Sequence, residues 1–522
     1  MPQCPSTSAS SSSSPSPAEK GGSAPRTRLS KSRYVSGLQC VKRLWLEVHH
    51  PERGVIDGGQ RAALSAGTAV GELARGLYPG GVLVDEGPGH FGAALDRTRE
   101  LLADASIPAI FEGAFVYAGV RVRADVLVRA ADGRWRLVEV KAGTRVKDVY
   151  VDDLTIQRFV LEGCGLALEA CELLHVNADY VRGCGGIHWP SYFQRTDLTL
   201  AAGLRLHRVP ELLSKFDGVV RAEFAPVREP GAQCSKPYGC PFRADCTAAK
   251  PDDWVGNLPR ISRRHRTLLS QLGVERIGDI PWNFPLSRAQ RRVCEVVRGE
   301  APRFAETLPE ALRAACLPAL YLDFEAMNPA VPLYAGTRPY QRIPFQWSLH
   351  RVDGAGVVRH AGFLARPEAG DPRRQLAERL LGAVGEVCDE PILAYSGYEA
   401  SVVADLAKAF PDLAAALGKL QARLFDLLAV VREHVYHPEF AGSFSLKTVA
   451  PVLVSDIGYA DLDDVTGGGE AALAFARMAR GEVVGDEVAA LPEALEAYCA
   501  CDTLALAKLH NVLLTADEGG AT

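Results

Sequence analysis

Several residues between positions 112 and 157 are of the types that hydrolyse phosphodiester bonds with the help of a metal ion. Glu139 and Lys141 lie two residues apart in an apolar stretch, so on a strand both side chains point to one face. Asp125 lies among apolar residues just upstream, where a lone acid is costly unless it is paired or binds a metal. Carboxylates bind Mg²⁺, which polarises a phosphoryl oxygen and acidifies a water, and a nearby lysine can orient that water. The alternative is an ordinary salt bridge on an exposed pair of strands.

The order of these residues resembles the RecB-like branch of the PD-(D/E)XK nucleases. Glu112 precedes Asp125, Glu139 and Lys141, and Gln157 follows on a predicted helix. The resemblance implies that Asp125 and Glu139 bind Mg²⁺ or Mn²⁺ and that Lys141 is catalytic. It also implies a restriction-endonuclease-like domain in this part of the chain.

A second set of acids lies in the C-terminal half. Asp323 and Glu325 are two apart on an apolar stretch typical of a strand, so they share a face. Tyr498 and Asp502 are four apart in a predicted helix, 495–513, and also share a face. Such carboxylates can hold two Mg²⁺ ions about 4 Å apart, which stabilise the attacking and leaving oxygens. Taken singly, the acids could be a surface pair and Tyr498 a packing residue.

The spacing of this second set resembles the DEDD exonucleases of the RNase H-like fold. Their first motif is Asp-x-Glu and their third is Tyr-x3-Asp, as here. Glu399 stands at the place of the middle motif, where that family has Asp, and Asp426 is an alternative ligand. The segment 445–450 resembles the one before the third motif, and 329–350 resembles an uncharacterised bacterial family that joins both halves.

Four cysteines bracket the first set of acids. Cys234, Cys240 and Cys246 are each separated by five residues, and Cys40 lies far upstream. Structural zinc sites bring their ligands in closer pairs, which this spacing lacks. The alternative to a joint site is that Cys40 is a small buried residue and that the other three cysteines bind zinc with an additional ligand.

One N-terminal and three C-terminal thiols around a nuclease-like core resemble the iron–sulfur nucleases of the RecB superfamily. That resemblance implies a [4Fe–4S] cluster held by Cys40, Cys234, Cys240 and Cys246, which ties the two ends of the domain together.

These residues must be positioned by alternating strands and helices. Strands are predicted at 111–117, 120–129 and 135–140, then at 321–325, 346–352 and 358–364, with a helix near 152–162. The pattern predicts an α/β multidomain protein that combines a PD-(D/E)XK domain with an RNase H-like, DnaQ-type domain.

Composition supports a division into several parts. A chain of 522 residues is too long for one core. We expect a disordered Ser/Pro-rich tail at 1–28, the first nuclease domain at 29–250 and the second at 311–515, with a short tail at 516–522. Between them, residues 251–310 are rich in arginine and are predicted to be a helical connector, which resembles a helix-hairpin-helix around 269–280.

Net charge, apolar runs and cysteine content limit the partners and the cellular compartment that we expect for this chain. The formal net charge is -5, so no global basic field indicates a nucleic-acid partner. No apolar run reaches the roughly 18 residues that a membrane span needs, and no secretory signal is evident. With thirteen cysteines, the chain suits the reducing cytoplasm, where clustered thiols indicate metal.

The sequence therefore predicts a Mg²⁺- or Mn²⁺-dependent nuclease with two active sites and an iron–sulfur cluster. Its expected substrate is nucleic acid, DNA more than RNA, single-stranded or at ends. The alternative is a nucleic-acid-binding or scaffold protein in which one or both sites are inactive.

Overall fold

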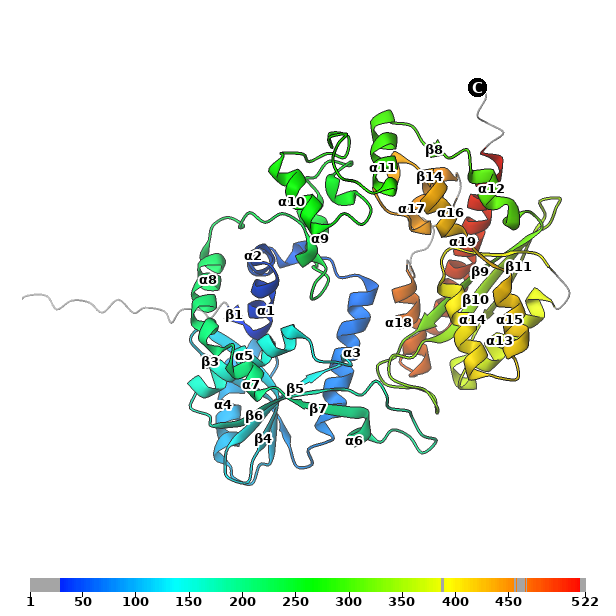
Figure 1. The fold of residues 1–522 in the computed structure, drawn as a ribbon. Coiled ribbons are helices and arrows are strands. Elements are labelled where there is room, and N and C mark those ends of the chain that lie inside the picture. Colours follow the sequence, from blue (N-terminus) through cyan, green and yellow to red (C-terminus); the bar gives the residue numbers. More distant parts are fainter. Residues whose placement is uncertain (1–28, 386–388, 455–456, 458–464, 466, 517–522) are drawn as a thin grey trace, which may run out of the picture.

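The computed structural model describes residues 29–385, 389–454, 457, 465 and 467–516, and the tails predicted at 1–28 and beyond 516 lie outside these ranges. Two large sheets, each covered by helices, form two units that are joined by a connector (Figure 1). This confirms the predicted α/β multidomain class. We use the predicted bounds to name these parts: residues 29–250 are called the first unit, 251–310 the connector and 311–515 the second unit.

The first unit is built on a mixed sheet in the order β2-β3-β4-β5-β6-β7, with β1 paired to β4 at the side. Its strands are β1 (Leu29–Ser30), β2 (Val82–Leu83), β3 (Ala109–Tyr117), β4 (Val120–Arg129), β5 (Trp135–Lys141), β6 (Leu168–Val176) and β7 (Phe193–Asp197). The three strands predicted here from alternating apolar residues are confirmed, within two residues at each end. Buried and exposed positions alternate along the first half of β4, as a half-buried strand requires.

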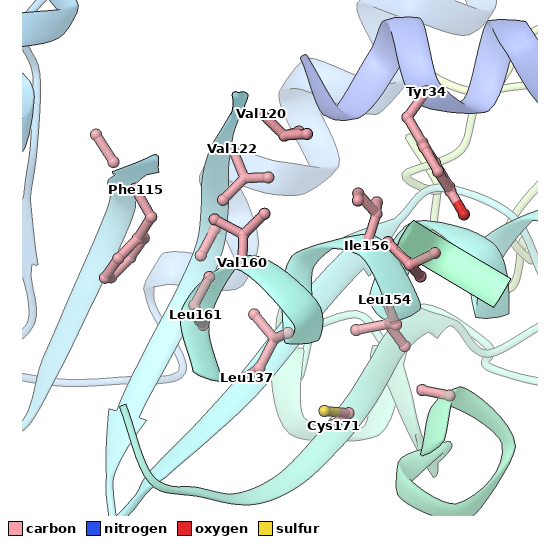
Figure 2. Close-up of a cluster of buried hydrophobic side chains, with 14 of the residues drawn as sticks. Tyr34, Phe115, Val120, Val122, Leu137, Leu154, Ile156, Val160, Leu161 and Cys171 are labelled. Carbon is pink, nitrogen blue, oxygen red and sulfur yellow. The ribbon is translucent and has the colours of Figure 1, made fainter. Parts of the chain in front are cut away.

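Helices cover both faces of this sheet. They are α1 (Lys31–Gln39), α2 (Val41–His49), α3 (Gly58–Arg75), α4 (Phe91–Ala103), α5 (Asp148–Gly163), α6 (Trp189–Tyr192), α7 (Thr199–Gly203), α8 (Val209–Arg221) and α9 (Arg243–Thr247). On one face α5 is buried along most of its length, with Leu154, Val160 and Leu161 packed against Val122 and Leu137 of the sheet (Figure 2). On the other face Val70 and Ala74 of α3 belong to a second core. A helix and a sheet so tightly packed can hold polar side chains at fixed distances.

The connector differs from the predicted helix-hairpin-helix. Its elements are α10 (Arg263–Gln271), α11 (Arg288–Gly299), β8 (Arg303–Phe304) and α12 (Leu308–Leu312), and residues 272–287 contain no helix. Gly273 has a φ of 70°, and Pro281 and Pro285 lack the N–H that a helix interior needs. Its apolar side chains share one core with the second unit, so the connector packs as part of that unit.

The second unit has a five-stranded sheet in the order β11-β10-β9-β12-β13. Its strands are β9 (Ala319–Met327), β10 (Ile343–Val352), β11 (Val358–Leu364), β12 (Ile392–Ala394) and β13 (Leu424–Asp426), and β14 (Val435–Tyr436) pairs with β8. The central strand β9 is antiparallel to β10 and parallel to β12. The strands predicted at 321–325, 346–352 and 358–364 are confirmed within β9, β10 and β11.

Helices flank this sheet on both faces. They are α13 (Arg373–Val384), α14 (Tyr398–Ala409), α15 (Ala414–Ala422), α16 (Leu427–His434), α17 (Leu446–Leu453), α18 (Gly468–Ala479) and α19 (Glu487–Thr515). The predicted helix 495–513 is the C-terminal two thirds of α19, which packs on β9 and β10. On one face of the sheet, Leu322 and Phe324 of β9 are buried in a core that also contains Leu380 of α13 and residues of α14.

The two units contact each other through a loop and a helix. The loop 328–342 between β9 and β10 reaches the first unit, where Arg182 Nη1 donates to the carbonyls of Pro332 and Leu333, both at 2.8 Å. Tyr340 at its end donates from its hydroxyl to the carbonyl of Ala142, next to Lys141. Nearby, α18 lies against α3 (Figure 1). The loop that follows Glu325 therefore ends beside the strand that carries Lys141.

Within the described residues, no helix is both long enough and apolar enough to cross a membrane.

Candidate active sites

The sheet of the first unit brings Asp125, Glu139 and Lys141 together. Val126 on β4 is paired with Val138 on β5, which places Asp125 beside Glu139. Asp125 Oδ2 accepts a hydrogen bond from the backbone N–H of Val140 at 2.8 Å. The Glu139 side chain is fully buried, and Lys141 Nζ donates to its Oε1. The two-residue spacing thus places both side chains on one face, as predicted. We call this cluster the first centre.

Helix α5 completes the first centre with Gln157 and with a residue that the sequence analysis missed. Gln157 Nε2 donates to Glu139 Oε2 at 2.7 Å. One turn earlier, Asp153 Oδ2 accepts from Lys141 Nζ at 2.7 Å. The i,i+4 spacing of Asp153 and Gln157 was the sequence signal that could have identified Asp153.

A second lysine, also missed, reaches the same carboxylates from α1. Lys31 Nζ lies 3.1 Å from each Glu139 oxygen, 3.5 Å from Asp125 Oδ1 and 3.8 Å from Asp153 Oδ1. No local pattern connects Lys31 with acids so far along the chain, because only the packing of α1 on the sheet brings them together.

Glu112 lies at the edge of the first centre. Phe111 pairs with Val126 and Gly113 with Ala124, so Glu112 faces Asp125 across the two strands. Its side chain is one third exposed and forms an ion pair with Arg75 at 3.5 Å. Of the five residues predicted here, Lys141 and Gln157 donate to Glu139, Asp125 accepts from the backbone next to Glu139, and Glu112 acts on Asp125 through its charge.

The pKa values of Asp125 and Glu139 in the first centre are shifted in opposite directions. Burial raises the pKa of Asp125 to about 7, and the negative charge of Glu139 adds to the shift. Burial also acts on Glu139, but the Lys141 and Lys31 ammonium groups outweigh it and hold the pKa of Glu139 well below its usual range. The first centre therefore contains its own positive charges.

The second unit brings three predicted acids into a tighter group. Asp323 and Glu325 lie on the central strand β9, and Asp502 lies on α19, which packs across that strand. Each of the three offers an oxygen, and these oxygens all lie within 4.8 Å of one another. Glu325 and Asp502 are 7% and 8% exposed. Among the described residues, this is the only group of three or more His, Cys, Asp or Glu with ligand atoms so close. We call it, with its neighbours, the second centre.

Glu399 lies in the pocket of the second centre, and Asp426 is outside it. The pocket is lined by Asp323, Asp502 and Glu399, with Ser396 and Lys447 among the other residues. Glu399 is in the first turn of α14 and accepts a hydrogen bond from Ser396 Oγ at 3.2 Å. Asp426 is exposed and caps α16 by accepting from the N–H of Ala429 at 3.3 Å. The geometry favours Glu399 as the middle acid.

Tyr498 lies in the second centre with a lysine that the sequence analysis had not assigned. Lys447 Nζ donates to the Tyr498 hydroxyl at 2.9 Å, and it lies 4.3 Å from the centre of the ring. Lys447 belongs to the segment 445–450. The resemblance of this segment to the one before the third motif of the DEDD exonucleases was the sequence signal that could have identified Lys447. Cys499 is also buried here, with its Sγ 3.5 Å from Asp323 Oδ2.

Three acids of the second centre, Asp323, Glu325 and Glu399, have raised pKa values. Burial, with the charges of its acidic neighbours, raises the pKa of Asp323 well above its ordinary value. Burial and Asp502 raise the pKa of Glu325 to about 8, although Lys447 opposes the shift. Burial raises the pKa of Glu399 to about 7. Buried carboxylates that repel one another in this way need either protons or a cation.

This predicts a pH-dependent stability that Mg²⁺ reverses. A glutamate whose pKa is raised by folding stabilises the folded state while it is protonated, and this contribution is lost as the pH rises from about 5 to about 8. We expect the melting temperature of the metal-free protein to fall over this range, and millimolar Mg²⁺ to restore it at pH 8. The control is Glu325→Gln, whose melting temperature should fall less and respond less to Mg²⁺. Equal pH profiles for both proteins would contradict the assignment.

The four predicted thiols line one enclosed pocket of the first unit. Cys40 lies between α1 and α2, and the other three lie in the loop and short helix after α8. The pocket walls also include Lys42, Arg43 and Phe242. Gln39 Nε2 donates to the carbonyls of Gln233 and Tyr238, at 2.7 and 2.8 Å, which fastens the helix junction to the cysteine loop. Residues far apart in the sequence are thus held around one space.

All four thiols are free of disulfides. In the described part of the chain, no three cysteines bring their sulfurs within 4.8 Å of one another.

Comparisons with known proteins give limited matches. No curated protein matches the chain. A solved structure titled "Crystal structure of SSO0001" is similar over 36% of this chain and 75% of its own, at 13% identity and a TM-score of 0.18. A family described as "Domain of unknown function (DUF2779)" matches residues 320–445. That stretch includes Asp323, Glu325 and Glu399 and ends before Tyr498 and Asp502.

Proposed function

We propose that this protein is a metal-dependent nuclease that hydrolyses phosphodiester bonds at its second centre. The observation that carries the proposal is the group formed by Asp323, Glu325 and Asp502, with oxygens within 4.8 Å of one another. Burial and neighbouring acids raise the pKa values of Asp323 and Glu325, and a divalent cation would relieve the repulsion between these carboxylates. We infer that the second unit is an RNase H-like exonuclease domain of the DEDD type, with Glu399 as the middle acid.

The donor set fits Mg²⁺ or Mn²⁺, because hard cations prefer carboxylate oxygens. When bound, such an ion would polarise the phosphoryl oxygen and lower the pKa of the attacking water. Tyr498 lies beside the acids and is held by Lys447, so its hydroxyl is positioned to orient a water or the scissile phosphate. Arg342 lies 4.9 Å from the centre of the Tyr398 ring and pairs with Asp405, which places a cation and an aromatic ring near Glu399. Stacking and charge of this kind suit a single strand.

For the first centre we infer a RecB-like PD-(D/E)XK site. Its support is that Lys141 and Gln157 donate to Glu139, while Asp125 accepts from the backbone N–H of Val140 beside it. Asp125 and Glu139 would hold the cation, and Lys141 would orient the attacking water. Its position on the same strand as Glu139 keeps the two side chains together.

We further infer that Cys40, Cys234, Cys240 and Cys246 hold a [4Fe–4S] cluster. The support is chemical: four reduced thiols line one pocket, and their spacing in the sequence lacks the close pairs of structural zinc sites. A cluster there would link α1 and α2 to the cysteine loop and so fasten both ends of the first unit.

A second candidate function is favoured by Lys31. The Lys31 ammonium group lies within 3.8 Å of oxygens from Asp125, Glu139 and Asp153, which favours the alternative in which the first site is inactive. In that case only the second centre would be catalytic, and DNA would be the first substrate to test.

The testing experiment is cleavage of end-labelled single-stranded DNA and RNA by the purified full-length protein with Mg²⁺. Glu139→Gln and Asp323→Asn are compared with the wild type. The centres lie on separate folds, so we expect each variant to lose a different part of the cleavage pattern, with additive effects in the double variant. Loss of all cleavage in Asp323→Asn alone would assign catalysis to the second centre alone. Full cleavage in the double variant would overturn the nuclease proposal.

A further inference from the structure

The first centre holds a positive charge where its carboxylates would bind a metal. Lys31 Nζ is within 3.8 Å of oxygens from Asp125, Glu139 and Asp153. These acids come from β4, β5 and α5, so the ammonium group lies where three elements converge. Lys141 contacts Glu139 and Asp153 from the strand that carries Glu139 itself. Lys31 is the lysine that contacts all three acids.

Lys31 is placed there by ordered structure. Leu29 is 6% exposed and belongs to the main core of the first unit. Leu29 and Ser30 pair with Val120 and Arg121 of β4. Ser30 then caps α1 by accepting from the N–H of Arg33 at 3.3 Å. A paired strand and a capped helix flank Lys31, so its backbone is held on both sides.

The charge balance of the two centres differs for this reason. At the second centre burial raises the pKa values of Asp323, Glu325 and Glu399, and neighbouring acids raise those of Asp323 and Glu325 further. At the first centre two ammonium groups, those of Lys31 and Lys141, donate to Glu139, although burial still raises the pKa of Asp125. A divalent cation approaching the first centre would meet the repulsion of Lys31 and would compete with it for the same oxygens.

We propose that the Lys31 ammonium group occupies the cation position of the first centre, so that this centre binds Mg²⁺ or Mn²⁺ weakly until Lys31 is displaced or removed. The inference rests on the proposed function, because it assumes that the first centre is a metal centre. It names Lys31 as the residue that sets the metal affinity of that centre.

The test is Mn²⁺ binding to the full-length protein, measured by electron paramagnetic resonance of the free ion. In the wild type, tight binding should be lost in Asp323→Asn and unchanged in Glu139→Gln. In an Asp323→Asn background, Lys31→Met should bind Mn²⁺ about ten-fold or more tightly than the parent, because one repelling charge has gone. Adding Glu139→Gln should remove this gain. Lys147→Met is the matched control, since Lys147 is an exposed lysine near the ring of Tyr150 and should change nothing.

Two results would overturn the inference. One is tight Mn²⁺ binding in the wild type that Glu139→Gln abolishes, and this result does not depend on the folding of any Lys31 variant. The other is unchanged Mn²⁺ affinity in Lys31→Met. If Lys31→Met is less stable without metal, Mn²⁺ should restore its melting temperature, and should fail to do so once Glu139→Gln is added.

Binding and cleavage distinguish this inference from the proposed function. If Lys31→Met gains Mn²⁺ but no variant cleaves nucleic acid, the nuclease proposal fails and the role of Lys31 stands. If Glu139-dependent cleavage occurs and Lys31→Met leaves Mn²⁺ affinity unchanged, the role of Lys31 fails and the nuclease stands.

Discussion

Asp323→Asn is expected to lower the Mg²⁺-dependent cleavage rate of the second centre by about 100-fold or more, with little change in melting temperature at pH 6. The physical reason is that Asp323 belongs to the group of three acids whose oxygens lie within 4.8 Å of one another. An amide keeps the shape of the side chain and loses the negative charge that attracts the cation. The measurement is the single-turnover rate at saturating Mg²⁺, in a Glu139→Gln background that silences the first centre.

Glu399 and Asp426 provide the matched comparison for this prediction. Glu399 is buried in the pocket, so Glu399→Gln should lower the cleavage rate by a similar factor. Glu399→Asp should retain activity, because Asp is the residue that the DEDD exonucleases have in their middle motif. Asp426 is exposed and caps a helix, so Asp426→Asn should be mild. An inactive Asp426→Asn together with a normal Glu399→Gln would show that the middle acid has been misplaced.

Cys40→Ser is expected to remove the iron and to lower the melting temperature of the first unit by about 10 °C or more. Cys40 joins α1 to α2 and faces a pocket that Cys234, Cys240 and Cys246 also line. Loss of any one ligand breaks the same link between the ends of the unit. Cys246→Ser should therefore have the same effect, and the double variant should be no worse than either single one.

The measurements are iron content and visible absorbance of anaerobically purified protein, together with thermal unfolding. Cys316→Ser is the control, because Cys316 is an exposed thiol outside the pocket. Colourless protein with one equivalent of zinc would contradict the cluster. A Cys40→Ser variant that keeps its iron would show that Cys40 only packs against its neighbours.

Local patterns in the sequence determined much of the scaffold. Alternating apolar residues located β4 and β11 at their observed bounds, since a strand exposes its period-2 pattern directly. The same period placed Glu139 with Lys141, and Asp323 with Glu325, on shared faces. The four-residue spacing of Tyr498 and Asp502 likewise matched one face of α19. The helix-hairpin-helix failed because a glycine in a left-handed conformation and two prolines break the region that apolar spacing had suggested.

Only the tertiary structure decided which of these faces meet. Lys31 enters the first centre because β1 pairs with β4, and Lys447 reaches Tyr498 because α17 packs on α19. Both contacts join residues far apart in the chain, and no local period encodes them. The choice of Glu399 over Asp426 was also open in the sequence, because Glu399 follows the short strand β12 and Asp426 ends the short strand β13. The structure decides this choice through burial. Glu399 lies in the first turn of α14 and lines the pocket, whereas the exposed Asp426 carboxylate caps α16. Residue types and spacing thus specified the candidate chemistry, and long-range packing determined which charges share a site.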